Sequence, residues 1–327
     1  MDGKKKKKNI KIIREFGIIV AILLIAIIFT LIDPLYVTPY NIISIIEQST
    51  INGLMGIGIT FAILAAGIDL SIGSTFAIII VCVGKLLVSG INPILAIIIG
   101  IGLGFAVGIG NGLLICKMNI QPFVATLGTM SLYRGIAYIL TGGWPVLNIP
   151  KNFRSMVDGD ILYNIPVSIF ILLLFAFLTH ILLKYTRFGI YIYALGGNEE
   201  ATRLSGVSVD RVKILAYGIV GIGAALAGIV MLARLGTGEP SAGQGYELNA
   251  IAAAAIGGAS LAGGKGSIIG TFLGAILLSA LKVGLIVVGV DTFWQYIATG
   301  IIIILAVYIE YVQSKLYSKS LTVRYQE

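Results

Sequence analysis

The feature that most constrains this chain is a series of ten apolar stretches separated by short polar breaks. Almost all of them are about long enough for an α-helix to cross roughly 30 Å of lipid hydrocarbon, although the eighth needs a short or broken helix. Strands of a membrane β-barrel would instead need about ten residues each with alternating polarity. The sequence therefore predicts an all-α, polytopic membrane protein with about ten transmembrane helices, some broken or short. The stretches lie near residues 17–32, 51–66, 72–88, 93–115, 123–140, 165–183, 212–233, 248–262, 267–288 and 293–309.

The composition agrees with a membrane protein. Hydrophobic residues make up 57% of the 327 residues and charged residues 12%, and the mean hydropathy is +1.00. A soluble domain of this composition could not cover its surface with polar groups. The net charge of +8 would also suit a nucleic-acid-binding protein, but the basic residues cluster at the ends of the apolar stretches. We therefore expect a lipid bilayer around the chain and no nucleic acid partner.

The positions of the basic residues predict the orientation of the chain. Cytoplasmic segments of membrane proteins carry an excess of Lys and Arg, and most of the 23 basic residues fall in cytoplasmic segments if the chain starts in the cytoplasm. We expect both termini in the cytoplasm and a multi-pass location in the cell (plasma or inner) membrane. The first apolar stretch meets Asp33-Pro34 without a small-residue cleavage site, which favours an uncleaved helix over a signal peptide. The predicted regions of this single domain, 1–327, are a basic cytoplasmic N-terminus (1–15), an outer loop (142–165), a polar cytoplasmic segment (194–210) and a cytoplasmic tail (312–327).

The polar segment at residues 194–210 carries the start and stop signals of a short helix. Asn198 is a good N-cap residue, and Glu199 and Glu200 follow in the first turn, where carboxylates complement the helix dipole. Gly206 is placed to end the helix about two turns later. One interpretation is an ordinary cytoplasmic loop with a chance helix. The other is a short helix that lies across the membrane face and docks a soluble partner.

Ala66-Gly-Ile-Asp-Leu-Ser-Ile-Gly-Ser74 interrupts two apolar stretches with the polar residues Asp69 and Ser71. Broken membrane helices must satisfy their freed backbone groups against protein or water, so such breaks gather near substrate paths or helix hairpins. The alternative is that Asp69 simply caps the third helix at the cytoplasmic surface.

Two groups of glycines recur at four-residue spacing. Small residues at this spacing line one face of a helix and let a neighbouring backbone come close. We interpret them as helix-packing residues first, with an opening in a pore as the alternative. They are Gly100, Gly104, Gly108 and Gly112 in the fourth stretch, and Gly266, Gly270 and Gly274 in the ninth.

Residues that would carry catalysis or metal binding are sparse. The chain has no Ser-His-Asp order, no carboxylate pair on a soluble face and no nucleotide-binding loop. Gly263-Gly-Lys-Gly-Ser267 lacks the first glycine of a phosphate loop and the Ser or Thr after its lysine. No second His or Cys at metal-ligand spacing accompanies His180. We expect neither an enzyme nor a metal site.

Several motifs resemble one family of transporters. Asn198, Ala201, Ser205 and Gly206, which follow Gly197, match the part of its pattern that reads Asn-x-x-Ala-x-x-x-Ser/Ala-Gly. The other matches are the break at 66–74, Asn111-Gly112, Pro122-Phe-Val-Ala-Thr-Leu-Gly128, Arg134-Gly135 and the stretch 246–267. Together they resemble carbohydrate ABC importer permeases of the ribose, galactose and xylose type, over about residues 44–310.

This resemblance implies a single transmembrane permease domain that translocates a monosaccharide. It implies one or two ATP-binding ABC subunits, an extracellular or periplasmic sugar-binding protein, and a second copy of the permease or a close homologue. The chain itself would need no cofactor, since ATP binds the partner subunit. The residues implied for coupling to the ATPase are Asn198, Glu199, Glu200, Ala201, Arg203, Ser205 and Gly206. The candidates for the translocation path are Asp69, Ser71, Asn111, Thr126, Arg134 and Lys282.

Alternatives to this function remain open at the level of sequence. Permeases of the same superfamily carry nucleosides or branched-chain amino acids, and Lys282 stands where the sugar permeases often have an amide. A secondary transporter would place ionisable groups inside the membrane, where this chain offers Arg134, Lys282, Glu47 and Asp69. We expect Arg134 and Lys282 to face protein or a water-filled path, with anchoring by a carbonyl or carboxylate and contact with sugar both open.

Overall fold

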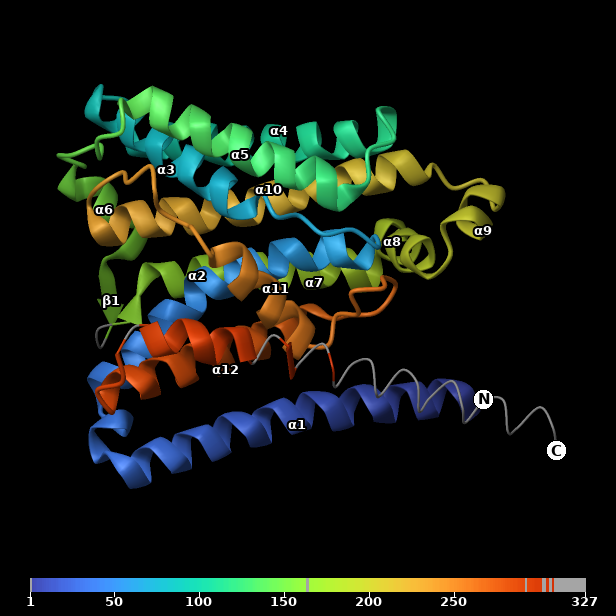
Figure 1. The fold of residues 1–327 in the computed structure, drawn as a ribbon, viewed down its shortest axis with the longest axis horizontal. Coiled ribbons are helices and arrows are strands. Elements are labelled where there is room, and N and C mark those ends of the chain that lie inside the picture. The colour runs from blue at the N-terminus through green and yellow to red at the C-terminus, as the bar shows by residue number, and fades with distance from the viewer. Residues whose placement is uncertain (1, 163–164, 292, 302–303, 306–307, 309–327) are drawn as a thin grey trace.

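The computed structural model describes residues 2–162, 165–291, 293–301, 304–305 and 308. Long helices lie side by side across the molecule (Figure 1), and the only strands among these residues form a short antiparallel hairpin. In chain order the elements are α1 (Asp2–Ile32), η1 (Pro34–Val37), α2 (Pro39–Leu64), α3 (Ile72–Val88), α4 (Pro93–Lys117), α5 (Pro122–Thr141), α6 (Lys151–Asp158), β1 (Asp160–Leu162), β2 (Ile165–Pro166), α7 (Val167–Tyr185), α8 (Arg187–Gly197), α9 (Glu199–Leu204), α10 (Val209–Leu235), α11 (Tyr246–Ile256) and α12 (Ile268–Val287).

Seven helices in the described part of the chain are long and apolar enough to cross a membrane: α1, α2, α4, α5, α7, α10 and α12. The helices α3 and α11 are shorter apolar helices, so the eighth stretch is helical only as far as Ile256. The tenth stretch, 293–309, lies partly outside the described residues. The all-helical membrane class is therefore confirmed, whereas ten crossings and the orientation of the termini stay predictions.

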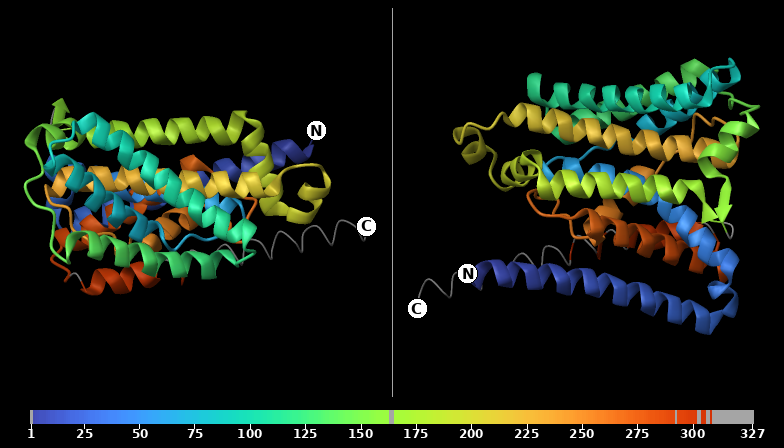
Figure 2. Two further views of the ribbon diagram at one scale, coloured as in Figure 1. Left: turned by 90° about the horizontal axis from the view of Figure 1, so that it is seen from above. Right: turned by 180° about the vertical axis from the view of Figure 1, so that it is seen from behind.

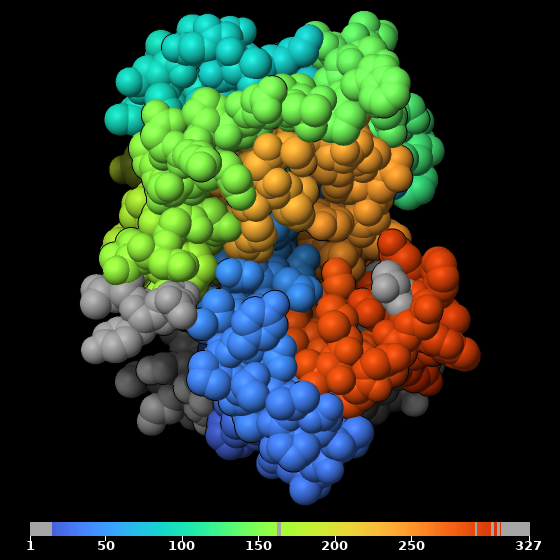
Figure 3. Space-filling view, turned by 90° about the vertical axis from the view of Figure 1, so that its left-hand side faces the viewer, coloured from blue at the N-terminus to red at the C-terminus, as the bar shows by residue number. Residues whose placement is uncertain are grey.

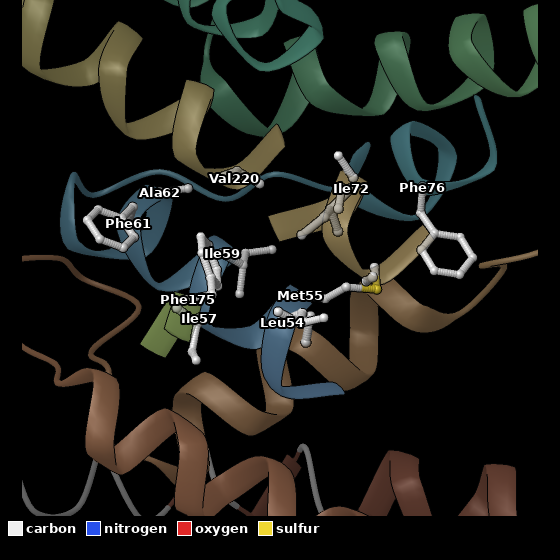
Figure 4. Close-up of a cluster of buried hydrophobic side chains, with 14 of the residues drawn as sticks. Leu54, Met55, Ile57, Ile59, Phe61, Ala62, Ile72, Phe76, Phe175 and Val220 are labelled. Carbon is white, nitrogen blue, oxygen red and sulfur yellow. The ribbon is translucent and has the colours of Figure 1, made fainter. Parts of the chain in front are cut away.

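The helix α2 forms the centre of the hydrophobic core. It packs against α7, α10, α11 and α12, and α10 in turn packs against α3 and α4. The helix α1 lies at one edge of the bundle beside α12, and α4 and α5 lie at the opposite edge (Figure 1, Figure 2). Figure 4 shows the side chains around α2: Leu54, Met55, Ile57, Ile59, Phe61 and Ala62 from α2, Ile72 and Phe76 from α3, Phe175 from α7 and Val220 from α10.

Glycines allow α4 to lie directly against α10. A Cβ atom added at Gly104 or Gly108 would collide with the backbone carbonyl of Gly221 or Tyr217 in α10. Gly112 faces the backbone of Ile214, while Gly100 faces the side chain of Val83. Side chains are thereby excluded from most of this contact. The two helices can then pack tightly, although the hydrophobic effect does not drive helices together within lipid.

The second glycine group is divided by the start of a helix. Gly270 and Gly274 lie on α12, where an added Cβ would collide with the carbonyls of Gly257 and Ala253. Gly266 instead lies in the turn before α12, because the side chain of Ser267 accepts a hydrogen bond from Gly270 N and caps the helix there. The prediction that Gly266 lies on the same helix as the other two is therefore wrong.

Two connections cross part of the bundle without helical structure. Residues 65–71 lead from α2 to α3, and residues 236–245 lead from α10 to α11 (Figure 1). The helices α3 and α11 consequently begin inside the bundle and close together, with the rings of Phe76 and Tyr246 5.6 Å apart. The interruption predicted between the second and third apolar stretches is thus paired with a second one that the sequence motifs do not mark.

The end of α2 places an alanine in a conformation that favours glycine. Ala66 has φ +57°, and the hydrogen bonds from Ala66 N to Ile63 O and from Gly67 N to Ala62 O form the Schellman motif. Glycine is the usual residue at this position, since a Cβ disfavours the left-handed conformation by about 1–2 kcal/mol.

We predict that Ala66→Gly stabilises the protein. The Ala66 side chain is exposed, so little packing is lost, and relief of the left-handed strain should exceed the entropic cost of glycine by roughly 0.5 kcal/mol. Thermal unfolding in detergent should show a higher midpoint. The control is Ala65→Gly, because Ala65 has φ −82° and should lose stability. A midpoint for Ala66→Gly as low as that of Ala65→Gly would contradict the assignment of strain.

Candidate functional site

The polar segment 194–210 lies at one end of the molecule. The helices α8 and α9 project at the same end as the N-terminus, whereas α6 and the β1–β2 hairpin lie at the other end (Figure 1, Figure 2). The short helix α9 leaves most of its surface free, since Thr202 is buried while Leu204 is 83% exposed. Sequence reasoning did not single out Leu204, although an apolar residue in a polar segment is a signal for a contact surface. Glu200, Ala201, Arg203, Ser205 and Gly206 are also exposed.

The termini of α9 follow the predicted signals. Asn198 is the N-cap, and its side-chain oxygen accepts a hydrogen bond from Ala201 N at 2.9 Å. Gly206 has φ +83° and follows the C-cap residue Ser205. The bond from Val207 N to Thr202 O completes a Schellman motif. The helix therefore has two defined ends despite its length of six residues.

Ion pairs hold α9 against α10. Glu199 pairs with Arg203 at 3.1 Å and with Lys213 of α10 at 2.6 Å. Partial burial raises the pKa of Glu199, but hydrogen bonds and charge from Lys213 and Arg203 outweigh that effect and leave the pKa below its usual value. Glu199 is thus ionised at physiological pH. Asp210 adds a contact to Lys117 at the end of α4, at 3.2 Å.

A buried polar network holds the interruption between α2 and α3. One carboxylate oxygen of Asp69 accepts hydrogen bonds from Ser71 N at 2.8 Å and from Ser71 Oγ at 2.7 Å. Asn111 of α4 donates to the other carboxylate oxygen at 3.2 Å and to Ser71 Oγ at 2.7 Å. Tyr133 of α5 donates to Asn111 Oδ1 at 3.0 Å. The network joins α4 and α5 to the interruption, and sequence reasoning missed Tyr133.

Burial gives this network a structural role. Asp69 is 1% exposed and the N-cap of α3 is Ser71, so the alternative that Asp69 caps the helix at the surface is wrong. Thr126 is also buried and donates to Ile68 O at 3.1 Å. The structure therefore brings four of the six path candidates, Asp69, Ser71, Asn111 and Thr126, around one segment of backbone. Their place in a translocation path stays a prediction.

Arg134 holds the second interruption. Its Nη1 donates to the carbonyl oxygens of Pro240 at 2.8 Å and of Ala242 at 2.7 Å. Its Nη2 reaches Gly73 O in the first turn of α3 at 3.3 Å. One guanidinium on α5 thereby donates to carbonyls from residues 236–245 and from α3. Of the alternatives that the sequence left open for Arg134, the structure shows anchoring by carbonyl groups.

Lys282 lies apart from the other candidates. It is exposed on α12, a helix that packs beside α1, α2 and α11. Among the described residues no hydrogen bond or ion pair to its side chain is found. The structure therefore does not join Lys282 to the network around Asp69 or to the carbonyls around Arg134.

A second ion-pair cluster, which sequence reasoning missed, lies at the end of the molecule that carries α6. Arg234 of α10 binds both carboxylate oxygens of Asp158, at 2.9 and 3.2 Å, and donates to Glu47 O of α2 at 3.0 Å. Ser168 of α7 donates to the same carboxylate at 2.5 Å. These bonds fix the end of α6, in the 142–165 loop, over the bundle. Figure 3 shows this loop in green beside the orange chain that follows α10.

The described residues contain no group of three or more His, Cys, Asp or Glu side chains arranged to hold a metal ion. The polar groups described above are joined by hydrogen bonds and ion pairs to other side chains and to backbone groups. The exposed α9 is suited to binding another protein, and the two buried sites are suited to holding irregular backbone inside a membrane.

Comparison with known proteins gives consistent matches over nearly the whole chain. Residues 41–307 match the family model described as "Branched-chain amino acid transport system / permease component". The ribose import permease protein RbsC of Bacillus subtilis is 40% identical over 300 residues, covering 91% of this chain and 93% of that protein. RbsC of Escherichia coli K12 is 38% identical over 318 residues, covering 95% and 97%. The galactose/methyl galactoside import permease protein MglC of E. coli K12 is 34% identical over 325 residues, covering 94% and 97%. No solved structure matches the chain significantly.

We predict that Arg134→Ala lowers the stability of the fold, because carbonyls of the 236–245 segment lose their charged donor. The expected cost is roughly 2 kcal/mol or more. Arg134→Lys should recover only part of it, since an ammonium group cannot reproduce the planar fork of a guanidinium. The measurement is the yield of monodisperse protein and its thermal midpoint in detergent.

The control for this prediction is Arg211→Ala, since Arg211 is an exposed arginine. An Arg134→Ala protein with the yield and midpoint of Arg211→Ala would show that the carbonyls do not depend on Arg134.

Proposed function

The chain belongs to the branched-chain amino acid transport system / permease component family, and from this membership we propose that it is the membrane-spanning subunit of an ATP-driven importer of a monosaccharide. It is a multi-pass membrane protein and not an enzyme, because ATP hydrolysis in such transporters lies on a separate ATPase subunit. The observation that carries the proposal is identity of 38–40% to two ribose import permeases over more than nine-tenths of this chain.

Two alternative functions have less support. The family description names branched-chain amino acids, but the relatives reported above are named for ribose and galactose. A secondary transporter would need an ionisable group free to bind a coupling ion. Of the four ionisable candidates, Asp69 and Arg134 are both engaged in several hydrogen bonds and are therefore not free for this role.

We propose that the end with α8 and α9 faces the cytoplasm and the end with α6 faces outward. The N-terminus, next to which lie the basic residues 4–8, is at the same end as α9 (Figure 1). Basic residues favour the cytoplasmic side of a membrane. Under this proposal residues 1–15 and 194–210 are cytoplasmic and 142–165 are outside. The cytoplasmic tail 312–327 lies outside the described residues and is proposed from the sequence alone.

The proposed partners follow from this orientation. Within the coupling segment 194–210, residues 198–209 would dock the ATP-binding subunit, which supplies the nucleotide, so the permease itself takes no cofactor. A sugar-binding protein would dock at the opposite end, beside the ion-pair cluster of Arg234 and Asp158. A second copy of the permease, or a close homologue, completes the transporter. An ATPase can shift the permease between inward-open and outward-open states only through contacts that differ between those states.

We predict that single cysteines label from opposite sides of the membrane. Ser155 on α6 and Ser205 after α9 are exposed serines, so Ser155→Cys and Ser205→Cys are matched changes. In a background with Cys82 and Cys116 replaced by alanine, an impermeant maleimide should label Cys at 155 on intact cells and Cys at 205 only after lysis. Labelling of position 205 on intact cells would reverse the proposed orientation.

We predict that Gly206→Val uncouples transport. The space around Gly206 is open, so the cost arises from φ +83°, which a β-branched residue avoids and asparagine tolerates. Permease reconstituted with its ATPase and its binding protein should import labelled ribose or a related monosaccharide. Gly206→Val should lose sugar-stimulated ATP hydrolysis while remaining assembled, and Gly206→Asn should keep it.

Two results would count against the proposal. If Gly206→Val keeps wild-type sugar-stimulated ATP hydrolysis, residues 194–210 form an ordinary loop and do not couple the ATPase to transport. Import of leucine or of nucleosides, with none of the monosaccharides tested, would favour the alternative substrates.

A further inference from the structure

Three separate segments of backbone meet next to the proposed docking helix. They are the end of α2 at residues 64–66, the end of α8 at residues 196–197 and the turn between α11 and α12 at residues 263–266. Gly264 N donates a hydrogen bond to Leu64 O at 3.1 Å, which joins the first segment to the third. The end of α8 lies against both of them.

Gly196 is the residue of α8 at this meeting point. A Cβ added there would collide with Leu64 O and with Gly264 N. From the side of the turn, a Cβ added at Gly263 would lie 2.8 Å from Gly196 O and 2.7 Å from the Cβ of Ala66. No side chain separates the three backbones, so a displacement of α8 cannot be absorbed by a change of rotamer.

Tyr193 provides a second link, one turn earlier on α8. Its hydroxyl donates to Gly266 O in the turn before α12 at 2.9 Å. The α8 helix is therefore attached to the turn both by close packing at Gly196 and by a hydrogen bond from a residue three positions before it.

The two segments that meet Gly196 connect to the elements beside the interruptions. Leu64 directly precedes residues 65–71 and α3, whereas the turn follows α11, the helix that residues 236–245 precede. The first turns of α3 and the segment before α11 are held by the same side chain, Arg134. On the other side of Gly196, only Gly197 and Asn198 separate it from α9.

We propose that Gly196 is the positioning residue through which movement of the docked α9 reaches both interrupted segments together. The proposal rests on the proposed function, since it names the route by which the ATPase drives the permease. Gly196 acts by letting three backbones touch, so that a shift of α8 moves the end of α2 and the α11–α12 turn as one unit. The N-terminal ends of α3 and α11 would then change their spacing inside the membrane.

The adjacent glycine gives a matched test. Gly197 has no atom within 4 Å of an added Cβ, so Gly197→Ala adds the same methyl group one position away without a collision. Both variants are assembled with the ATPase in proteoliposomes, and ATP hydrolysis per assembled complex is measured with and without the loaded binding protein. We expect Gly196→Ala to bind the ATPase but to lose about fivefold or more of the stimulation, and Gly197→Ala to keep it.

A milder variant covers the case in which Gly196→Ala does not fold. Tyr193→Phe removes one hydroxyl from the same contact, and Tyr191→Phe is its control, because no hydrogen bond from the Tyr191 hydroxyl is found among the described residues. Tyr193→Phe should bind the ATPase and hydrolyse ATP at the basal rate, yet show reduced stimulation. A purely structural role would change the amount of assembled complex and leave the stimulation of each complex unchanged.

The outcomes separate the two proposals. Wild-type stimulation in folded Gly196→Ala overturns the route through Gly196, and so does wild-type stimulation in Tyr193→Phe when Gly196→Ala cannot be purified. Loss of stimulation in Gly197→Ala or Tyr191→Phe as well would show a general sensitivity of α8 and also overturn it. A wild-type complex without any stimulation would instead remove the proposed function, and the route with it.

Discussion

The fold depends on satisfying backbone polar groups where the chain enters the bundle without a helix. An unpaired N–H or C=O in hydrocarbon costs several kcal/mol, so irregular backbone persists only when protein or a water-filled cavity surrounds it. Arg134 meets this requirement for residues 236–245 by donating to two of their carbonyls. In residues 65–71, Asp69 accepts a hydrogen bond from Ser71 N, and Thr126 donates one to Ile68 O. Because both segments are held, α3 and α11 can begin inside the membrane protein.

Close contact between backbones is the second requirement, and glycine residues allow it both along a whole helix and at a single point. Along α4, Gly104 and Gly108 let a whole helix lie against α10, which matters because lipid offers little hydrophobic drive for helices to associate. At Gly196 a single residue lets three short segments touch. The first contact fixes the bundle, whereas the second connects a surface helix to the interior.

Charged side chains have different partners at the two ends of the molecule and between these ends. Ion pairs lie at the two ends: Glu199 pairs with two basic residues at one end, and Asp158 pairs with Arg234 at the other. Arg134, which lies between these ends, is bonded to carbonyl groups of the chain itself. Under the proposed orientation, the ion pairs lie at the two ends where partner proteins would dock, whereas the charge between these ends is held by backbone carbonyls.

The amino-acid sequence by itself determined the class of the protein, its family and the ends of α9, since apolar length, motif spacing and capping at Asn198 and Gly206 are local properties. Only the tertiary structure decided what the interior polar residues do. Asn111 and Asp69 are 42 positions apart, and Arg134 and Ala242 are 108 apart, so no local pattern reveals that they meet or that Tyr133 joins them. For the same reason, the sequence alone does not show that Gly196 and Gly197 differ in their surroundings. Their difference arises from Leu64 and Gly264, which only folding brings against one of them.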